Sequence, residues 1–255
     1  MKRTFEPVDI AIVVALALEA RPLCDHLRRA ARLRAADRRV TVGQLGARSV
    51  AVIEAGVGRT AAEQATQLVI DGHRPRQAII AAGLCGGLDP AIPRATIIVP
   101  AVVGHSGSAE ARPLISAPSL PLQPSKEQAQ VSGLLVTCDT VVSTPAAKQA
   151  LHAATGAVAV DMESWWIVAV AARAGIPCHV IRAVSDTATE SIAPDIAALA
   201  AIPSPARQAG TALRLAWRRP SAIGELAELR EHAYRAADAL AGYLIEFVTT
   251  IATTI

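Results

Sequence analysis

The chain has 255 residues and a formal net charge of +3, with 52% hydrophobic and only 3% aromatic side chains. This length and hydrophobic fraction suffice for one α/β domain with a sizeable core. The small net charge and the scarcity of aromatic rings argue against a nucleic-acid binder, which needs a basic stripe with stacking platforms. The four cysteines are widely spaced, which favours reduced thiols and a cytoplasmic location over a disulfide or metal framework.

The N-terminal apolar run is interpreted as a buried first strand over residues 8–16. Glu6 and Asp9 interrupt the approach to this run and Glu19 closes it, which argues against a secretory signal peptide. No apolar run in the sequence approaches the ~20 residues that are needed to span a bilayer. We therefore expect no transmembrane segment.

A helix is predicted from residue 18 to about residue 33, followed by strands at 39–43 and 48–54 that pair and turn at Gly46. The stretch 21–39 is rich in arginine. We interpret these arginines as a solvated helix face and a turn, with binding of an anionic substrate or a membrane surface as the alternative.

Two glycine-rich turns follow. Gly58 and Arg59 precede a helix predicted over residues 60–70, and a helix N-terminus can bind an anion, although a Gly-x-Gly turn alone is a weak signal. Residues 77–82 are predicted as a buried strand that ends in a loop at 83–87 with three glycines. Such a loop lets the backbone approach a ligand and present its N–H groups.

The middle of the chain is predicted to contain a short strand at 95–100, a strand and turn at 133–139, a helix at 145–152 and a strand at 157–160. Residues 102–130 lack any periodicity. They form the longest predicted loop, and long loops in compact domains are often lids or disordered segments.

The acidic motif Asp-Met-Glu-Ser at 161–164 stands before an apolar helix predicted over 164–174 and a buried strand predicted over 178–184. Asp186 follows the end of that strand. Because ligands of open α/β sheets bind outside the carboxyl ends of strands, we expect Glu163 and Asp186 at one sheet edge, where a site would lie.

The C-terminal segment 203–250 is predicted to be helical, beyond a loop or helix at 187–201. It contains a helix at 206–219 and a last long helix from about residue 221 to about residue 247. The apolar stripe of the last helix fits packing on the sheet or on a second subunit. Contact with a membrane surface is the alternative, although the polar face is as acidic as it is basic.

These motifs resemble those of the nucleoside phosphorylase and methylthioadenosine/S-adenosylhomocysteine nucleosidase superfamily. The resemblance covers most of the chain and rests on separated motifs at 56–59, 83–88, 133–139 and 161–186. It implies one domain over residues 1–255 with a three-layer α/β/α fold and a central mixed, partly barrel-like sheet. It also implies a homo-oligomer, most simply a dimer, and no metal or organic cofactor.

By matching position, the resemblance assigns roles at the sheet edge. Asp186 would protonate the leaving purine at N7, Glu163 would bind the ribose hydroxyls and Met162 would pack on the sugar. Glu19 would orient the attacking water. The chemistry agrees, because N-glycosidic cleavage leaves an oxocarbenium-like sugar and an anionic base that an acid must neutralise. The other residues implied to line the pocket are Asp161, Gly83, Leu84, Cys85, Gly86, Val141 and Ser185.

Three positions depart from the family pattern. Leu84 replaces a serine of the glycine loop, Val141 replaces an aromatic residue that stacks on the base, and Ala81 stands where phosphorylases carry an arginine for phosphate. These departures favour water over phosphate as the nucleophile. A phosphorylase with phosphate at Gly58 and Arg59 stays open, as does a nucleoside-binding protein without activity. Three carboxylates at one sheet edge argue against mere binding, since their repulsion costs stability.

Two further segments, 86–91 and 217–220, resemble the hopanoid-associated members of the superfamily. Those members are linked to removal of adenine from adenosylhopane, a lipid-linked nucleoside. The expected reaction is therefore hydrolysis of the N-glycosidic bond of a 5′-substituted adenosine. A lipid-linked 5′ group, with peripheral membrane contact, is one form of this expectation.

Overall fold

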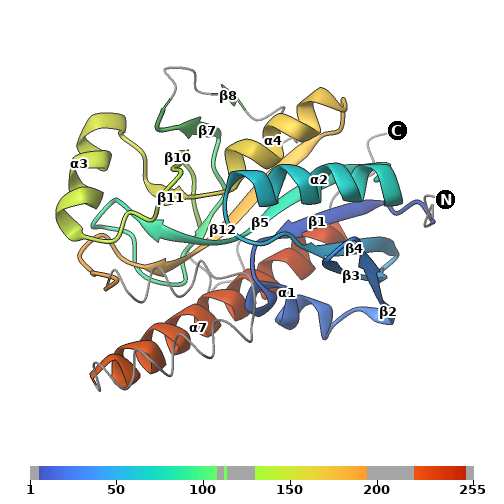
Figure 1. The fold of residues 1–255 in the computed structure, drawn as a ribbon, viewed down its shortest axis with the longest axis horizontal. Coiled ribbons are helices and arrows are strands. Elements are labelled where there is room, and N and C mark those ends of the chain that lie inside the picture. The colour runs from blue at the N-terminus through green and yellow to red at the C-terminus, as the bar shows by residue number, and fades with distance from the viewer. Residues whose placement is uncertain (1–5, 108–111, 114–129, 194–220, 251–255) are drawn as a thin grey trace.

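A computed structural model of the chain describes residues 6–107, 112–113, 130–193 and 221–250 (Figure 1). The strands are β1 (Ile10–Val14), β2 (Arg28–Ala35), β3 (Arg38–Leu45), β4 (Arg48–Glu54), β5 (Ala78–Gly87), β6 (Ile97–Ile98), β7 (Val102–His105), β8 (Arg112–Pro113), β9 (Gln130–Val131), β10 (Leu134–Thr137), β11 (Ala159–Asp161) and β12 (Cys178–Asp186). The helices within the described ranges are α1 (Ala17–Cys24), α2 (Arg59–His73), α3 (Pro145–Thr155), α4 (Ser164–Arg173) and α7 (Ser221–Thr250).

All strands join one mixed sheet whose main path runs β2-β3-β4-β1-β5-β11-β10-β7-β8. The long strand β5 is its branch point. It pairs in parallel with β1 and β12, and its last two residues turn antiparallel to β11. The strands β12, β6 and β9 continue from this branch. The central strands read as continuous apolar runs, because a parallel strand is buried on both of its faces.

Helices cover both faces of the sheet (Figure 1). On one face, α1 and α7 pack against each other, α7 lies on β12 and β5, and α1 lies on β4 and β1. Leu23, Leu240 and Leu244 enter that core. On the opposite face, α2 packs on α4, and Val69 and Trp165 belong to the second core. The predicted three-layer α/β/α class with a mixed sheet is thereby confirmed.

The helix predicted over residues 18–33 is wrong beyond Cys24. The chain leaves α1 there and enters β2, which pairs antiparallel with β3 at an edge of the sheet. Leu33 and Ala35 pack against the core, whereas the arginines of β2 are exposed. Side chains alternate between the two faces of a strand, and charges at a sheet edge discourage pairing with other chains. The arginine-rich stretch is thus an edge strand and not a helix face.

The loop predicted at 83–87 is also wrong, because β5 continues through these residues. Residues 102–105, inside the predicted long loop, form β7. The hairpin that turns at Gly46 and the helices predicted at 60–70, 145–152 and 164–174 are present, with ends that differ by a few residues. The last predicted helix corresponds to α7.

Residues 187–193 adopt no helix or strand, and the helix predicted over 206–219 lies outside the described residues. No helix in the described part of the chain has the length and apolar character needed to cross a membrane.

The absence of a side chain at Gly83 is required where β5 passes Arg182. A Cβ atom at Gly83 would lie 2.5 Å from Arg182 Nη1 and 3.0 Å from Glu19 Oε1. Overpacking of a buried position costs about 1–3 kcal/mol, so Gly83→Ala should lower the free energy of unfolding by about that amount, as measured by urea denaturation.

Gly104 in β7 is the matched control. A Cβ atom there would meet one atom within 4 Å, Leu134 Cδ1 at 3.4 Å, which is an ordinary contact. Gly104→Ala should therefore leave the urea midpoint nearly unchanged. Equal midpoints for the two variants would contradict the proposed clash at Gly83.

Candidate active site

The predicted site residues gather along the carboxyl ends of the central strands. Glu19 lies in the first turn of α1, directly after β1, while Glu163 follows β11 and Asp186 ends β12. Gly83 and Gly86 lie in the second half of β5, beside β12. The structure therefore brings together three carboxylates that are up to 167 positions apart, as Glu19 and Asp186 are.

A buried arginine, Arg182 in β12, lies among these carboxylates. Its side chain is 1% exposed, Nη2 lies 2.7 Å from Asp161 Oδ2, and Nη1 lies 3.7 Å from Glu163 Oε2. Burial alone would lower the pKa of Arg182, but the charges of Asp161, Glu163 and Glu19 raise it overall, so the guanidinium stays protonated. Across the described residues, no group of His, Cys, Asp and Glu is arranged to bind a metal ion.

Further hydrogen bonds fix the orientation of Arg182. Its Nε donates to Ser164 Oγ at 3.0 Å, and Nη1 donates to the carbonyl oxygen of Leu84 at 3.4 Å. Asp161 accepts from the Thr137 hydroxyl at 2.6 Å and from the Ser164 N–H at 2.9 Å. The ion pair between β12 and β11 is thus also linked to β5, β10 and the start of α4.

Glu19 is anchored by two backbone donors. Oε2 accepts from the N–H of Leu16 at 2.8 Å, and Oε1 accepts from the N–H of Leu84 at 2.8 Å. The residue is 3% exposed. Burial raises the pKa of Glu19, although the hydrogen bond from Leu84 and the charge of Arg182 oppose the shift. A carboxyl with a raised pKa is a better proton acceptor once it is ionised.

Glu163 connects the N-termini of α4 and α2. Its Oε1 accepts from the N–H of Gly58 at 2.9 Å. Burial raises the pKa of Glu163 to about 7, against the opposing charge of Arg182. The N–H of Gly58, which is the donor that an anion at this turn would need, is therefore already bonded to the Glu163 side chain. The guanidinium of Arg59 lies over the Trp166 ring at 4.2 Å, and its Nε is 3.4 Å from Glu63.

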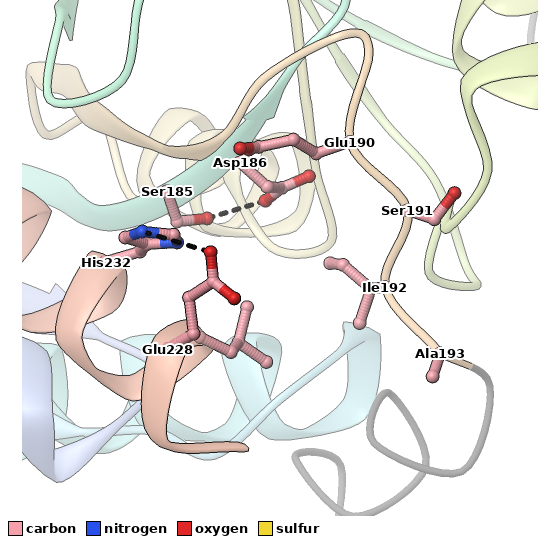
Figure 2. A pocket seen from close by; sticks show the side chains of 9 residues that line it. Ser185, Asp186, Glu190, Ser191, Ile192, Ala193, Glu228 and His232 are labelled. Carbon is pink, nitrogen blue, oxygen red and sulfur yellow. Dashed lines mark hydrogen bonds and ion pairs between the residues drawn. The ribbon is translucent and has the colours of Figure 1, made fainter. Parts of the chain in front are cut away.

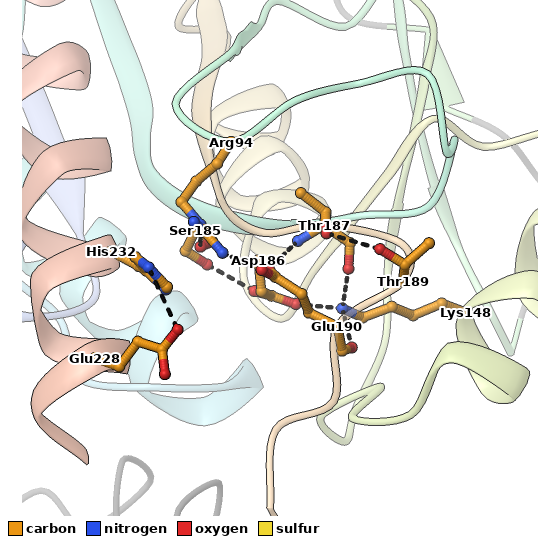
Figure 3. Close-up of polar contacts among 9 residues, drawn as sticks. All are labelled: Arg94, Lys148, Ser185, Asp186, Thr187, Thr189, Glu190, Glu228 and His232. Atoms are coloured by element: carbon orange, nitrogen blue, oxygen red, sulfur yellow. Dashed lines mark hydrogen bonds and ion pairs between the residues drawn. The ribbon is translucent and has the colours of Figure 1, made fainter. Parts of the chain in front are cut away.

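Asp186 belongs to a separate polar chain (Figure 3). Its Oδ2 lies 2.5 Å from the Nζ of Lys148, and its Oδ1 accepts from the Ser185 hydroxyl at 2.7 Å. The same hydroxyl lies 3.2 Å from the carbonyl oxygen of Cys85. A register shift between Val184 and Asp186 interrupts the pairing of β12 with β5. Such bulges re-aim side chains next to active sites.

A cavity of about 310 Å³ opens beside Asp186 (Figure 2). Ser185 and Asp186 form one wall, and the segment 190–193 forms another. α7 supplies a third wall, with His232 and its neighbour Glu228, whose Oε1 lies 3.9 Å from His232 Nε2. Pockets for small ligands typically measure roughly 300–1,000 Å³, so this cavity is large enough for part of a nucleoside.

The other predicted residues differ in their exposure. Met162 is half-buried beside Glu163, and Val141 is 39% exposed, so its side chain has room to meet a ligand. Burial raises the pKa of the Cys85 thiol, which therefore stays protonated. Leu84 contributes both of its backbone polar groups, to Glu19 and Arg182. Its apolar side chain in place of a serine leaves these two contacts intact.

Two charged residues of the site were not predicted. Arg182 stands inside an apolar strand, and a charge within a buried strand is a signal that a partner must exist. Lys148 lies in an alanine-rich helix, where a lysine gives no such signal because it usually faces water. Both are essentially fully buried.

Glu163 makes stability depend on pH. Its pKa is about 7 in the folded chain against 4.5 for a free carboxyl, so the folded state binds the proton more tightly. The contribution of Glu163 to the free energy of unfolding is up to ~3 kcal/mol. It is fully present below about pH 4.5 and is lost as the pH rises through about 7. Glu163→Gln removes this titration, so its unfolding free energy should fall less steeply over that interval than that of the wild type.

Urea unfolding between about pH 4.5 and about pH 7.5 measures the difference. Glu231→Gln, at a side chain that is 61% exposed on α7, is the control and should follow the wild-type curve. Parallel curves for the wild type and Glu163→Gln would show that Glu163 does not titrate in this interval.

The chain is similar to proteins of one known family. Residues 9–201 match the family described as the Phosphorylase superfamily. A 5′-methylthioadenosine/S-adenosylhomocysteine nucleosidase of Shewanella oneidensis is 29% identical over 202 residues, which cover 71% of this chain and 85% of that protein.

Two solved structures illustrate the fold. The 5′-methylthioadenosine/S-adenosylhomocysteine nucleosidase of Neisseria meningitidis, in complex with methylthio-immucillin-A, has a TM-score of 0.71 at 19% identity, over 94% of this chain and 98% of that chain. A futalosine hydrolase mutant of Helicobacter pylori has a TM-score of 0.72 at 16% identity, over 94% and 97%. At these identities the likeness establishes the fold alone. The family match spans well over half of the sequence, and the chain belongs to the phosphorylase superfamily.

Proposed function

We propose that the chain is a purine nucleosidase, which hydrolyses the N-glycosidic bond of a 5′-substituted adenosine and releases adenine. One observation carries this proposal. Three buried carboxylates, Glu19, Glu163 and Asp186, lie along one sheet edge, each with its own hydrogen-bond donors. The Shewanella relative, which carries the name of a nucleosidase, supports the reaction class.

Asp186 is the acid for the leaving base. It lies in the wall of the cavity, where a purine can approach its carboxyl group. When the bond between N9 and C1′ breaks, its electron pair moves into the purine. A proton delivered to N7 neutralises the charge that develops there, and such general acid catalysis typically contributes roughly 10²–10⁴-fold in rate.

Glu163 and Met162 take the sugar. A carboxylate that accepts hydrogen bonds from the ribose hydroxyls becomes more stabilising as positive charge develops at C1′. The Gly58 N–H fixes one oxygen of Glu163. The other oxygen faces Arg182 at 3.7 Å, and this positive charge favours the ionised form of Glu163, which the sugar requires.

Glu19 positions the nucleophile. Its carboxyl group is fixed by the N–H groups of Leu16 and Leu84, and each carboxylate oxygen keeps a second lone pair for a water molecule. As the water oxygen attacks C1′, Glu19 accepts the proton that the water loses. The pKa of Glu19, raised by burial, suits this role as a base.

Water is favoured over phosphate as the nucleophile by the charge balance. The buried guanidinium of Arg182 is already surrounded by Asp161, Glu163 and Glu19, so this part of the site carries excess negative charge. A phosphate dianion would be repelled there, because like charges in a buried site disfavour one another. In addition, the Gly58 N–H, which would be the backbone donor for phosphate, already donates to Glu163.

An apolar, lipid-linked 5′ group, as in adenosylhopane, is the extended form of this proposal. It is supported by the resemblance of segments 86–91 and 217–220 to hopanoid-associated proteins. The arginines of β2 at positions 28, 29, 32 and 34 are exposed, which suits peripheral contact with an anionic membrane surface. The family resemblance also supports a homodimer, which is part of this proposal.

Adenine release tests the proposed reaction. Chromatography should detect adenine from 5′-methylthioadenosine both with and without phosphate, together with a free sugar. Asp186→Asn and Glu19→Gln should each lower kcat by roughly 10²–10⁴-fold, because one loses the acid and the other the base. Asp71→Asn, on the exposed side of α2, is the control and should retain full activity.

Two outcomes would contradict the proposal. Release only in the presence of phosphate, with formation of a sugar 1-phosphate, would make the chain a phosphorylase. No release from any 5′-substituted adenosine would leave the alternative of a nucleoside-binding protein.

The 5′ group is tested with 5′-alkylthioadenosines of increasing chain length. If the natural substrate is lipid-linked, kcat/KM should rise with chain length, because each buried methylene contributes about 0.8 kcal/mol, or roughly fourfold. A decline beyond the methyl or butyl compound would restrict the enzyme to short 5′ substituents without affecting the proposed hydrolysis.

A further inference from the structure

The helix α3 buries a single side chain, and that side chain is a lysine. Lys148 is 0% exposed, whereas the remaining ten residues of α3 are half-buried or exposed. Burying an ammonium group is costly unless it is paired and hydrogen-bonded. An apolar residue at this position would attach α3 to the sheet without that cost. The charge of Lys148 therefore calls for an explanation beyond packing.

The Lys148 ammonium group finds three acceptors. Nζ lies 2.5 Å from Asp186 Oδ2, 2.6 Å from the carbonyl oxygen of Thr187 and 3.1 Å from the carbonyl oxygen of Glu190 (Figure 3). An ammonium group has three donors and no lone pair. Each of its protons thus has one acceptor, and only the acceptor on Asp186 is able to take a proton.

The same geometry suits the alternative position of that proton. If the proton moves to Asp186 Oδ2, the carboxyl group donates to the lone pair of the neutral Lys148 amine. The two remaining N–H groups keep their carbonyl acceptors, on Thr187 and Glu190. Every hydrogen bond is therefore conserved in both states, and no buried polar group loses its partner when the proton crosses.

Fixing the segment after β12 is not a sufficient role for Lys148, because other contacts already do so. Arg94 Nε donates to the carbonyl oxygen of Ser185 at 3.1 Å, and Arg94 also pairs with Glu190. The N–H of Thr187 donates to the Glu190 carboxylate at 2.8 Å. This network orders residues 185–190 without the help of α3.

We propose that Lys148 supplies the proton that Asp186 delivers to the leaving base. This inference rests on the proposed nucleosidase reaction and acts through Asp186, since Lys148 itself does not line the cavity. It assigns to α3 a part in the chemistry that its exposed, alanine-rich sequence does not suggest.

The bond between N9 and C1′ breaks and its electron pair enters the purine. The Asp186 carboxylate takes a proton on Oδ2 from Lys148 Nζ and passes one proton to N7, so that Asp186 is again a carboxylate at the end of the step. Water attacks C1′ and gives its proton to Glu19. Lys148 is left as a neutral amine and regains a proton from solvent, to which Glu19 releases one, before the next turnover.

The test compares two leaving groups. Adenine in 5′-methylthioadenosine needs a proton to leave, whereas 4-nitrophenolate, in the 4-nitrophenyl riboside with the same 5′-methylthio group, leaves as a stable anion. Lys148→Met should lower kcat for the nucleoside by roughly 10²-fold or more, and should leave kcat for the nitrophenyl riboside within about threefold of wild type. Gln149→Met, on the exposed side of α3, should alter neither rate.

Lys148→Arg separates proton supply from charge. Arginine keeps the ion pair with Asp186 but is not deprotonated in proteins, so this variant should show the same selective loss for the nucleoside. If Lys148→Met does not fold, Lys148→Arg alone tests whether Lys148 supplies the proton. Equal loss on both substrates, or full activity of Lys148→Arg on the nucleoside, would overturn the inference and leave Lys148 a structural residue.

Asp186→Asn distinguishes this failure from failure of the proposed function. If Asp186→Asn loses only nucleoside cleavage while the Lys148 variants do not, the proposed acid stands and the proton source is overturned. If Asp186→Asn loses both substrates equally or neither, the role of Asp186 is wrong, and the role of Lys148 is overturned with it.

Discussion

A guanidinium group buried among carboxylates is the interaction on which the rest of the site depends. Arg182 contacts Asp161 and Glu163 directly and lowers the electrostatic cost of Glu19. Removing one partner of a buried ion pair typically costs about 3–5 kcal/mol, because the other charge stays buried without compensation. The planar guanidinium of Arg182 is itself held in one orientation, since it also donates to Ser164 and to the Leu84 carbonyl. Each carboxylate is thereby placed relative to the same group.

One strand carries both charged centres of the site. β12 presents Arg182 near its middle and Asp186 at its end. Around Arg182 the carboxylates outnumber the cation, which suits a sugar that becomes positive. Around Asp186 one carboxylate meets one lysine, which suits a transferable proton. In the proposed glycosidic cleavage, the cationic sugar would therefore meet an excess of negative charge, and the anionic base would meet a charge-balanced pair a few residues away.

Much of this arrangement follows from the sequence, because local patterns determine the buried elements. The apolar runs predict β1 and α4, and the chain order places Glu163 and Asp186 at carboxyl ends of strands. The predictions are wrong where contacts between distant segments determine the secondary structure. The arginine-rich stretch after Cys24 has a composition that a helix would accept, and only its pairing with β3 makes it a strand. The glycines of residues 83–87 suggest a loop, yet their small size lets β5 pass Arg182 and Asp186 closely.

The two cations of the site, Lys148 and Arg182, were not predicted for the same reason. A lysine on an alanine-rich helix normally faces water, and the acceptor of Lys148 lies 38 positions further along the chain. Arg182 stands in an apolar strand, which signals a buried partner but does not say which of several carboxylates that partner is. Neither spacing nor periodicity encodes a contact between elements that lie far apart in the chain.

The hydrogen bond between Gly58 and Glu163 has a consequence for how the chain acquires activity. It joins groups 105 positions apart, and the contact between Glu19 and Leu84 spans a further 65. Closing such long loops costs chain entropy before any contact compensates it, and a high contact order slows folding. The proposed catalytic arrangement therefore has no local precursor. During synthesis, a ribosome-bound chain that lacks β12 contains Glu19 and Glu163 but neither Arg182 nor Asp186, so the proposed site stays incomplete until residue 186 has emerged.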